Sequence, residues 1–383
     1  MARISFLIYL VLAGLSLRAA VAPASARLKQ VSQEAGAARD AGRTNEAVAL
    51  YRRGVALQPG WAEGWWNLGT LQYDLNAFVP ARDAFAQFVK LQPDGAPGWA
   101  LRGLCEFELK QYPASLDHLQ RAMLLGLEQN PQLAKVTLYH AALLLTKSGH
   151  FPNAMKLYSM LASEAADDRD RIVGIGLAGL RLAMFPQEVP AEREAFVYRV
   201  GHAIFADARR QEAEARREFQ ALIAENPRTP ELHNLLAQML VRGDPDAAIT
   251  EWKNELSVSP GHTPAKLQLA FEYLKRGEPA AGLPYAREAV SQEPNSFVAH
   301  NALGRVLLAL DDMPGGIAEL EAAKGLAPDS PDTRFELASA YAKAGRNQDA
   351  MRERAEFLRL KKRPSKVSSG QARHGERRES SDR

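Results

Sequence analysis

The chain contains the stretch Trp65-Trp66-Asn67-Leu68-Gly69, which continues to Ala81, Phe85 and Leu91-Gln92-Pro93 and determines the fold. Apolar residues recur every three or four positions on both sides of a break in this stretch, which predicts two amphipathic helices. Gly69 lets the second helix approach closely, Ala81 is small at the helix crossing, and Pro93 stops the second helix. The stretch therefore predicts a helical hairpin that cannot bury its apolar faces alone.

The hairpin repeats along the chain. Prolines that would close a second helix stand at 59, 93, 227, 260, 294 and 328. The first two prolines lie 34 residues apart, and the last four lie 33, 34 and 34 residues apart. The gap from 93 to 227 is about four such periods. A fixed period over most of the chain predicts one array of stacked hairpins, with weaker copies in the middle.

The stretch resembles a tetratricopeptide repeat (TPR). The family pattern W-x2-L-G-x2-Y, A-x3-F, P is matched at Trp65, Leu68, Gly69, Ala81, Phe85 and Pro93. Gln72 stands where Tyr is usual, with Tyr73 beside it. The resemblance covers roughly residues 28 to 360 and implies an all-α, TPR-like α-solenoid, a right-handed superhelix of antiparallel helix pairs. It implies a binding scaffold without naming the partner.

Residues 1–26 have the pattern of a secretory signal peptide. Arg3 precedes the apolar run Ile4 to Leu17, and Ala24-Ser25-Ala26 supplies small residues before a cut. We expect cleavage after Ala26 and export to the periplasm or the medium. The alternative, a retained membrane anchor, is disfavoured because fourteen apolar residues fall short of the roughly 20 that span a bilayer.

The remaining chain divides into an N-terminal TPR-like array at 27–165, an irregular helical segment or degenerate repeat at 166–195, a C-terminal array at 196–360 and a basic, disordered tail at 361–383. The irregular segment contains Gly174, Gly176 and Gly179 in the spacing G-x-G-x-x-G. That spacing binds dinucleotides only when a strand precedes it. No strand is predicted there, so helix packing through small residues is favoured over nucleotide binding.

The net charge of +3 is unevenly placed. The signal carries +2 and the tail +5, which leaves −4 on the array. A mildly acidic array gives little electrostatic support for nucleic-acid binding. The tail is either a solubilising extension or a weak contact with an anionic surface.

No motif for catalysis, metals or cofactors is present in the sequence. The eight histidines lack the pairing at i,i+4 with a neighbouring Glu that helical zinc sites show. Cys105 is the only cysteine, so it forms no internal disulfide; it is read first as a small buried side chain, with a reactive thiol or an intermolecular bridge as alternatives. We therefore expect a protein that is not an enzyme, with no catalytic residues, no metal and no cofactor.

The concave side of such a stack is lined by the first helix of each pair. The candidates for partner binding lie off the packing ridge of these helices and are Trp66, Asn67, Thr70, Tyr73, Leu104, Phe107, His233, Leu267, Phe271, Lys275, Asn301, Arg305, Phe335 and Ser339. Packing between repeats is the competing interpretation of each aromatic residue. Trp65 is predicted to pack in the core and Trp66 to face the groove, because adjacent helical residues point about 100° apart.

These observations predict an exported, non-catalytic TPR scaffold that binds a protein or peptide along its concave face. Two alternatives stay open. One is a self-assembling structural protein of the cell envelope, and the other is an accessory subunit of an envelope enzyme complex. The identity of the partner and the oligomeric state are not readable from the sequence.

Overall fold

The computed structural model describes residues 26–161 and 168–362 of the 383-residue chain. The chain divides into two compact units, Met1–Pro190 and Ala191–Arg383, which we call unit 1 and unit 2. The predicted signal peptide, apart from Ala26, lies outside the described residues. Among the helices that are described, none is both long and apolar enough to cross a membrane.

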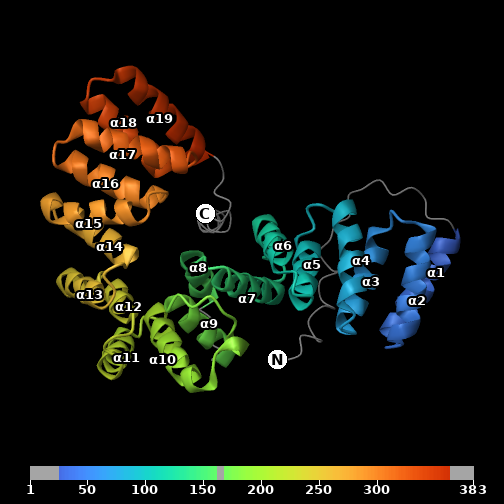
Figure 1. The fold of residues 1–383 in the computed structure, drawn as a ribbon. Coiled ribbons are helices and arrows are strands. Elements are labelled where there is room, and N and C mark those ends of the chain that lie inside the picture. The colour runs from blue at the N-terminus through green and yellow to red at the C-terminus, as the bar shows by residue number, and fades with distance from the viewer. Residues whose placement is uncertain (1–25, 162–167, 363–383) are drawn as a thin grey trace, which may run out of the picture. The chain divides into compact units, whose positions relative to one another are not determined.

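Unit 1 consists of antiparallel helix pairs followed by one unpaired helix (Figure 1). Its elements are α1 (Ala26–Asp40), α2 (Thr44–Leu57), α3 (Ala62–Asp74), α4 (Phe78–Leu91), α5 (Ala96–Glu108), α6 (Tyr112–Leu125), α7 (Pro131–Lys147), α8 (Phe151–Leu161), α9 (Arg169–Gly179) and the 3-10 helix η2 (Pro186–Glu188). Each helix packs on the next in chain order, as local hairpins joined by short turns must.

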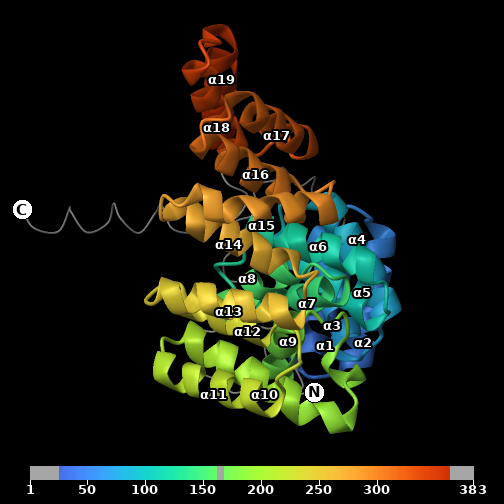
Figure 2. The ribbon, with the colours of Figure 1, turned by 60° about the vertical axis from the view of Figure 1, so that its left-hand side comes forward.

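Unit 2 is built in the same way, and its pairs follow one another in chain order in both views (Figures 1 and 2). Its elements are α10 (Ala191–Ala208), α11 (Glu212–Glu225), α12 (Leu232–Leu240), α13 (Pro245–Val258), α14 (Thr263–Lys275), α15 (Pro279–Gln292), α16 (Phe297–Ala309), α17 (Met313–Leu326), α18 (Pro331–Lys343) and α19 (Asn347–Lys362). The prediction of an all-α, TPR-like solenoid of helix pairs is confirmed.

The small residues Gly69 and Ala81, in the stretch 65–93 with which the sequence analysis began, lie where the two helices of a hairpin cross. A Cβ atom on Gly69 would come within 2.8 Å of the Phe85 ring, so only glycine lets α3 and α4 approach this closely. Ala81 and Phe85 are fully buried. The roles predicted for Gly69 and Ala81 are therefore confirmed.

Helix α9 takes the place of a first helix but has no second helix after it among the described residues. Its residues from Ile172 to Gly179 are buried, and it packs on α7 and α8. A Cβ atom on Gly174 would lie 2.5 Å from the Tyr158 hydroxyl, so this glycine serves close helix packing. No strand precedes α9 in the described part of the chain, and the condition for a dinucleotide fingerprint is not met.

The predicted start of the basic tail at residue 361 is wrong by two residues. Lys361 and Lys362 are the last two residues of α19, which continues the helix past Leu360. Basic residues in the last turn are favourable there, because they face the negative end of the helix dipole. The rest of the predicted tail, 363–383, lies outside the described residues.

The assignment of the two neighbouring tryptophans is also wrong. Trp66 has only 3% of its surface exposed, and its ring centroid lies 5.9 Å from that of Phe85 and 5.2 Å from that of Phe88. Trp65 is partly exposed, and its indole N–H donates to the carbonyl oxygen of Pro59 at 2.8 Å. The two side chains do point to different faces, but the face of Trp66 is covered by α4 and by the following hairpin.

We expect Trp66→Ala to lower the free energy of unfolding by about 3–5 kcal/mol, because it empties a buried aromatic site. Trp65→Ala should cost less, since this side chain is only partly buried and gives up one hydrogen bond worth about 1 kcal/mol. Urea unfolding followed by far-UV circular dichroism measures both. Equal destabilisation by the two substitutions would contradict this assignment.

Candidate functional site

Seven of the hairpins carry a recurring side chain on their first helix, in the place that Trp65 occupies in its own repeat. We call these side chains the anchor residues, and they are Trp65, Trp99, Arg199, His233, Lys266, His300 and Arg334. The anchors of unit 1 are aromatic, whereas those of unit 2 carry a basic group.

Anchor residues bind the end of the preceding hairpin. The indole N–H groups of Trp65 and Trp99 donate to the carbonyl oxygens of Pro59 and Pro93, each at 2.8 Å. In unit 2, His300 Nε2 lies 2.9 Å from Pro294 O, and Arg334 Nη2 donates to Pro328 O at 2.9 Å. In each case the acceptor is the proline that closes the preceding repeat, six residues earlier. This hydrogen bond joins each of these four hairpins to the end of the preceding one.

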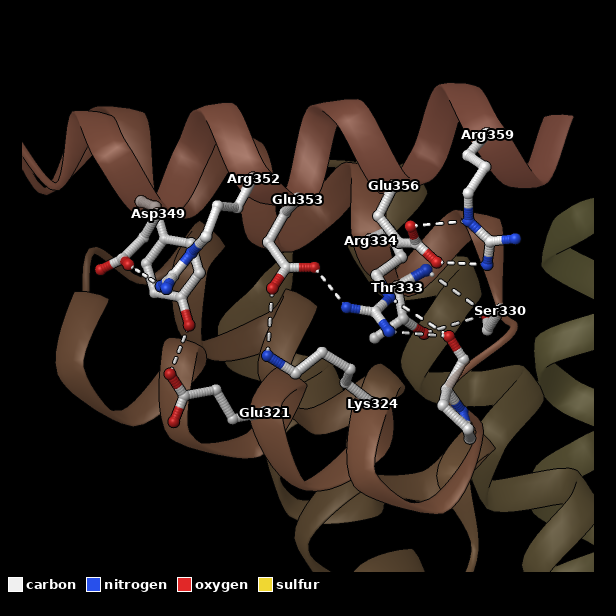
Figure 3. A network of polar contacts seen from close by, with 12 residues as sticks. Glu321, Lys324, Ser330, Thr333, Arg334, Asp349, Arg352, Glu353, Glu356 and Arg359 are labelled. Atoms are coloured by element: carbon white, nitrogen blue, oxygen red, sulfur yellow. Dashed lines mark hydrogen bonds and ion pairs between the residues drawn. The ribbon is translucent and has the colours of Figure 1, made fainter. Parts of the chain in front are cut away.

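The basic anchors of unit 2 also pair with a glutamate on the second helix of their own hairpin. The pairs are Arg199–Glu218 (2.6 Å), His233–Glu251 (2.6 Å), Lys266–Glu288 (2.8 Å), His300–Glu319 (2.6 Å) and Arg334–Glu353 (2.7 Å). Figure 3 shows the last of them, in which Glu353 lies between Arg334 and Lys324 of α17. The sequence analysis placed His233 among the binding candidates, and this pair shows it to be an anchor instead.

The His300 pair is sensitive to pH. Burial alone would lower the pKa of His300, but hydrogen bonds with Glu319 and the Pro294 carbonyl, together with the carboxylate charge, outweigh it and raise the pKa above its usual value. The protonated form is therefore more favourable in the folded chain than in the unfolded one. Its stabilising contribution is complete below the unfolded pKa of about 6.5 and is lost as the pH rises through the folded pKa.

We expect the loss of unfolding free energy caused by His300→Gln to shrink as the pH is raised from about 5.5 to 8.5. Arg334→Gln is the matched control, because a guanidinium at the equivalent place stays charged throughout this range. Urea unfolding of the three proteins at several pH values tests it. A His300→Gln loss that is constant with pH, like the control, would rule out titration of this pair.

Three first helices of unit 2, α14, α16 and α18, lie side by side and present one continuous surface. The Arg305 guanidinium of α16 lies 5.7 Å from the Phe271 ring centroid of α14, and its Nε is 3.4 Å from Glu336 Oε1 of α18. Asn301 Nδ2 donates to Thr333 Oγ1 at 3.2 Å. We call this surface the first-helix face of unit 2.

Of the predicted residues of unit 2, Phe271, Asn301 and Arg305 make the contacts that define this face. Leu267, Phe271, Asn301 and Arg305 are half-buried, while Lys275 and Ser339 are exposed. Phe335 is 51% exposed, and its ring lies 5.5 Å from that of Phe357 on α19. Phe335 fits both interpretations of the sequence, packing between helices and availability to a partner, because it packs on α19 and is also half exposed to solvent.

Four predicted residues of unit 1 are buried and do not form a binding surface. These are Trp66, Asn67, Thr70 and Leu104. Asn67 is 2% exposed and accepts a hydrogen bond from Arg39 Nη1 of α1 at 2.8 Å, so it joins neighbouring hairpins. The physical reason is that the face on which they lie is covered by adjacent helices of the stack.

Tyr73 and Phe107 remain partly exposed on the first helices of unit 1. Phe107 lies among aromatic rings, with centroids 5.8 Å from Tyr112, 4.7 Å from His140 and 5.8 Å from Phe185. Burial lowers the pKa of His140, which favours the neutral imidazole within this cluster. Tyr73 packs on Phe78 at 5.6 Å.

Sequence reasoning missed the anchor residues of unit 2. Their signal was present, because a basic residue recurs in the place of Trp65 from Arg199 to Arg334, with a glutamate 18, 19 or 22 residues further on. A basic residue does not match the tryptophan of the family pattern, and these pairs do not have metal-ligand spacing. His233 and His300 therefore have no partner that a known motif would indicate.

Cys105 is buried, as the first interpretation of the sequence predicted. Burial raises the pKa of its thiol, which favours the unreactive protonated form. Within residues 26–161 and 168–362, no group of three or more His, Cys, Asp and Glu side chains has the arrangement of a metal site. The described surface offers aromatic faces, amides and a few charges, which suit the binding of another polypeptide.

These hairpins and their anchors define the class of the protein as a helical repeat solenoid. The sequence model of the tetratricopeptide repeat matches residues 33–96, 80–133, 203–256 and 267–331, which together make up more than half of the chain. The chain belongs to the tetratricopeptide repeat family, as the resemblance indicated. Members of this fold are typically scaffolds for protein interaction.

Solved structures with a similar fold include a MamA double mutant (MamA RS-1 ArsTM), with 20% identity, a TM-score of 0.41, and coverage of 43% of this chain and 92% of that chain. MamA from Desulfovibrio magneticus RS-1, from residue 41 to its end, has 20% identity and a TM-score of 0.40, and the match covers 43% of this chain and 93% of that chain. YrrB, described as a TPR protein with an unusual peptide-binding site, has 14% identity and a TM-score of 0.38, and the match covers 43% of this chain and 84% of that chain. No curated protein matches the chain.

Proposed function

We propose that this protein is an exported scaffold that binds an extended segment of a partner protein along the first-helix face of unit 2. The observation that carries the proposal is the arrangement of Phe271, Arg305 and Glu336 on three adjacent first helices. An apolar ring, a cation and a carboxylate lie in sequence across the stack. A polypeptide that crosses these helices would meet each of them in turn.

The chemistry of this face suits a peptide that has both apolar and polar groups. The side chain of Arg305 is 39% exposed, and its contact with Glu336 occupies only part of a guanidinium that carries five N–H donors. Its remaining donors can bind a carboxylate or a backbone carbonyl of the partner. Exposed aromatic surface at Phe335 would take an apolar side chain, as aromatic residues do in protein interfaces.

We expect peptides selected from a random phage-displayed 12-residue library on the mature chain to bind this face. The double substitution Phe271→Ala with Arg305→Ala should weaken a selected peptide at least tenfold in fluorescence anisotropy, because it removes an apolar contact and a charged donor. Arg287→Ala is the matched control on the exposed side of α15, and it should change the affinity less than twofold.

Two results would contradict this function. One is the absence of any enriched peptide, and the other is an affinity that the double substitution leaves unchanged. Melting curves of both variants serve as the folding control. They separate a lost contact from a damaged unit.

Export is supported by the sequence pattern of residues 1–26 alone, which lie almost entirely outside the described residues. We expect the signal peptidase to cut after Ala26, because Ala24 and Ala26 are small residues at the places where the enzyme pocket admits nothing larger. N-terminal sequencing of the protein from a periplasmic or culture fraction measures it. A chain that keeps Met1 in the membrane fraction would instead establish an uncleaved anchor.

A further inference from the structure

One group of residues in unit 1 is not used by the function proposed for unit 2. It recurs after 34 residues at the ends of two successive first helices, as Tyr73, Asp74 and Phe78, and again as Phe107, Glu108 and Tyr112. In each copy an aromatic residue and a carboxylate end the first helix, and an aromatic residue begins the second. The two rings of a copy pack together, with centroids 5.6 Å apart in the first and 5.8 Å apart in the second.

The two carboxylates have no cationic partner within the described part of unit 1, whereas some other acids of this unit do. Glu106 is paired with Arg102 at 3.1 Å and with His118 at 2.6 Å, and Glu188 is paired with Lys147 at 2.7 Å. Asp74 and Glu108 have no hydrogen bond or ion pair from a side chain within the described part of unit 1. Asp74 is half-buried and Glu108 is exposed. Partial burial raises the pKa of Asp74 to about 6 and also raises that of Glu108.

The aromatic residues of the two copies pack against the same apolar cluster of unit 1. The charges of Glu108 and Asp74 both contribute, after burial and the Cys105 thiol, to the raised pKa of Tyr73. The four rings that share this cluster are Tyr73, Phe78, Phe107 and Tyr112. We call these two ring pairs, together with Asp74 and Glu108, the aromatic edge of unit 1, and the described residues place no cationic partner on its two carboxylates.

A lysine of the chain itself, Lys147, lies against an aromatic ring and a carboxylate next to this edge. Phe185 continues the aromatic edge, with its ring centroid 5.0 Å from that of Tyr112 and 5.8 Å from that of Phe107. Lys147 Nζ lies 5.3 Å from the Phe185 ring centroid and 2.7 Å from Glu188 Oε2. An ammonium group between an aromatic face and a carboxylate is thus already present beside the two copies that lack one.

We propose that the edge formed by Tyr73, Asp74, Phe107 and Glu108 binds lysine or arginine side chains of a basic, extended segment in a partner protein. The aliphatic stems of these side chains would lie on the aromatic rings, and their charged groups would reach the carboxylates. Binding then supplies a countercharge that the described residues of unit 1 do not provide. This surface belongs to unit 1, so the inference does not depend on the face of unit 2.

The probe is a fluorescein-labelled peptide with four lysines in a Gly-Ser background, and its analogue carries acetyl-lysine at the same four places. The full mature chain should bind the lysine peptide, and binding should weaken as salt is added, because the contact is electrostatic. The acetylated analogue keeps the aliphatic stems and loses the charge, and it should bind at least tenfold more weakly. Equal binding of the two peptides would overturn the proposal.

Asp74→Asn with Glu108→Gln should weaken the lysine peptide at least tenfold in anisotropy. The matched control is Glu63→Gln with Asp117→Asn, which changes the net charge equally at exposed acids of the same unit and should alter the affinity less than twofold. The double substitution should not lower the melting temperature, since it removes charges that are desolvated in the folded state. An equal loss in the control, or unchanged binding in the double variant, would overturn the proposal. Phe271→Ala with Arg305→Ala should leave this peptide's affinity unchanged, which separates this result from the test of unit 2.

Discussion

At four of the seven anchored hairpins, an anchor residue donates a hydrogen bond to the carbonyl of the preceding closing proline and so joins one hairpin to the next. Proline ends a helix because it lacks an N–H, and its carbonyl is left without a helical donor. Trp65 and Trp99 supply that donor from an indole, while His300 and Arg334 supply it from an imidazole and a guanidinium. The proline that ends one of these hairpins therefore also provides the carbonyl acceptor that binds the anchor residue of the next hairpin.

The choice of anchor changes how each unit is stabilised. An indole joins the hairpins by apolar contact and one hydrogen bond, and neither depends on pH. A basic anchor needs a carboxylate on the second helix to offset its desolvation, and Glu218, Glu319 and Glu353 provide it. Partly buried ion pairs add little net free energy, so the pairs of unit 2 mainly restrict how the two helices are oriented.

The fold was predictable because a 34-residue period is a property of the whole chain. Any one departure, such as Gln72 in place of tyrosine, leaves the period intact. The binding surface was less predictable, since it depends on how neighbouring hairpins cover each other. Trp66 and Leu104 have the spacing of exposed residues, yet the next hairpin buries them. Residues at the ends of first helices, such as Tyr73 and Phe107, escape this cover because the chain turns there.

Asp74 and Glu108 share a raised pKa at the hairpin turns, because partial burial there disfavours their ionised forms. In the folded chain, a carboxylate that is desolvated without a cation is less stable when ionised than it would be in water. An asparagine or glutamine would fit the same helix ends without that cost. Glu106, two residues before Glu108, shows that this fold can supply partners to a buried acid, through Arg102 and His118. The cost at Asp74 and Glu108 is therefore not imposed by the fold, and a cationic ligand would remove it by supplying the missing charge.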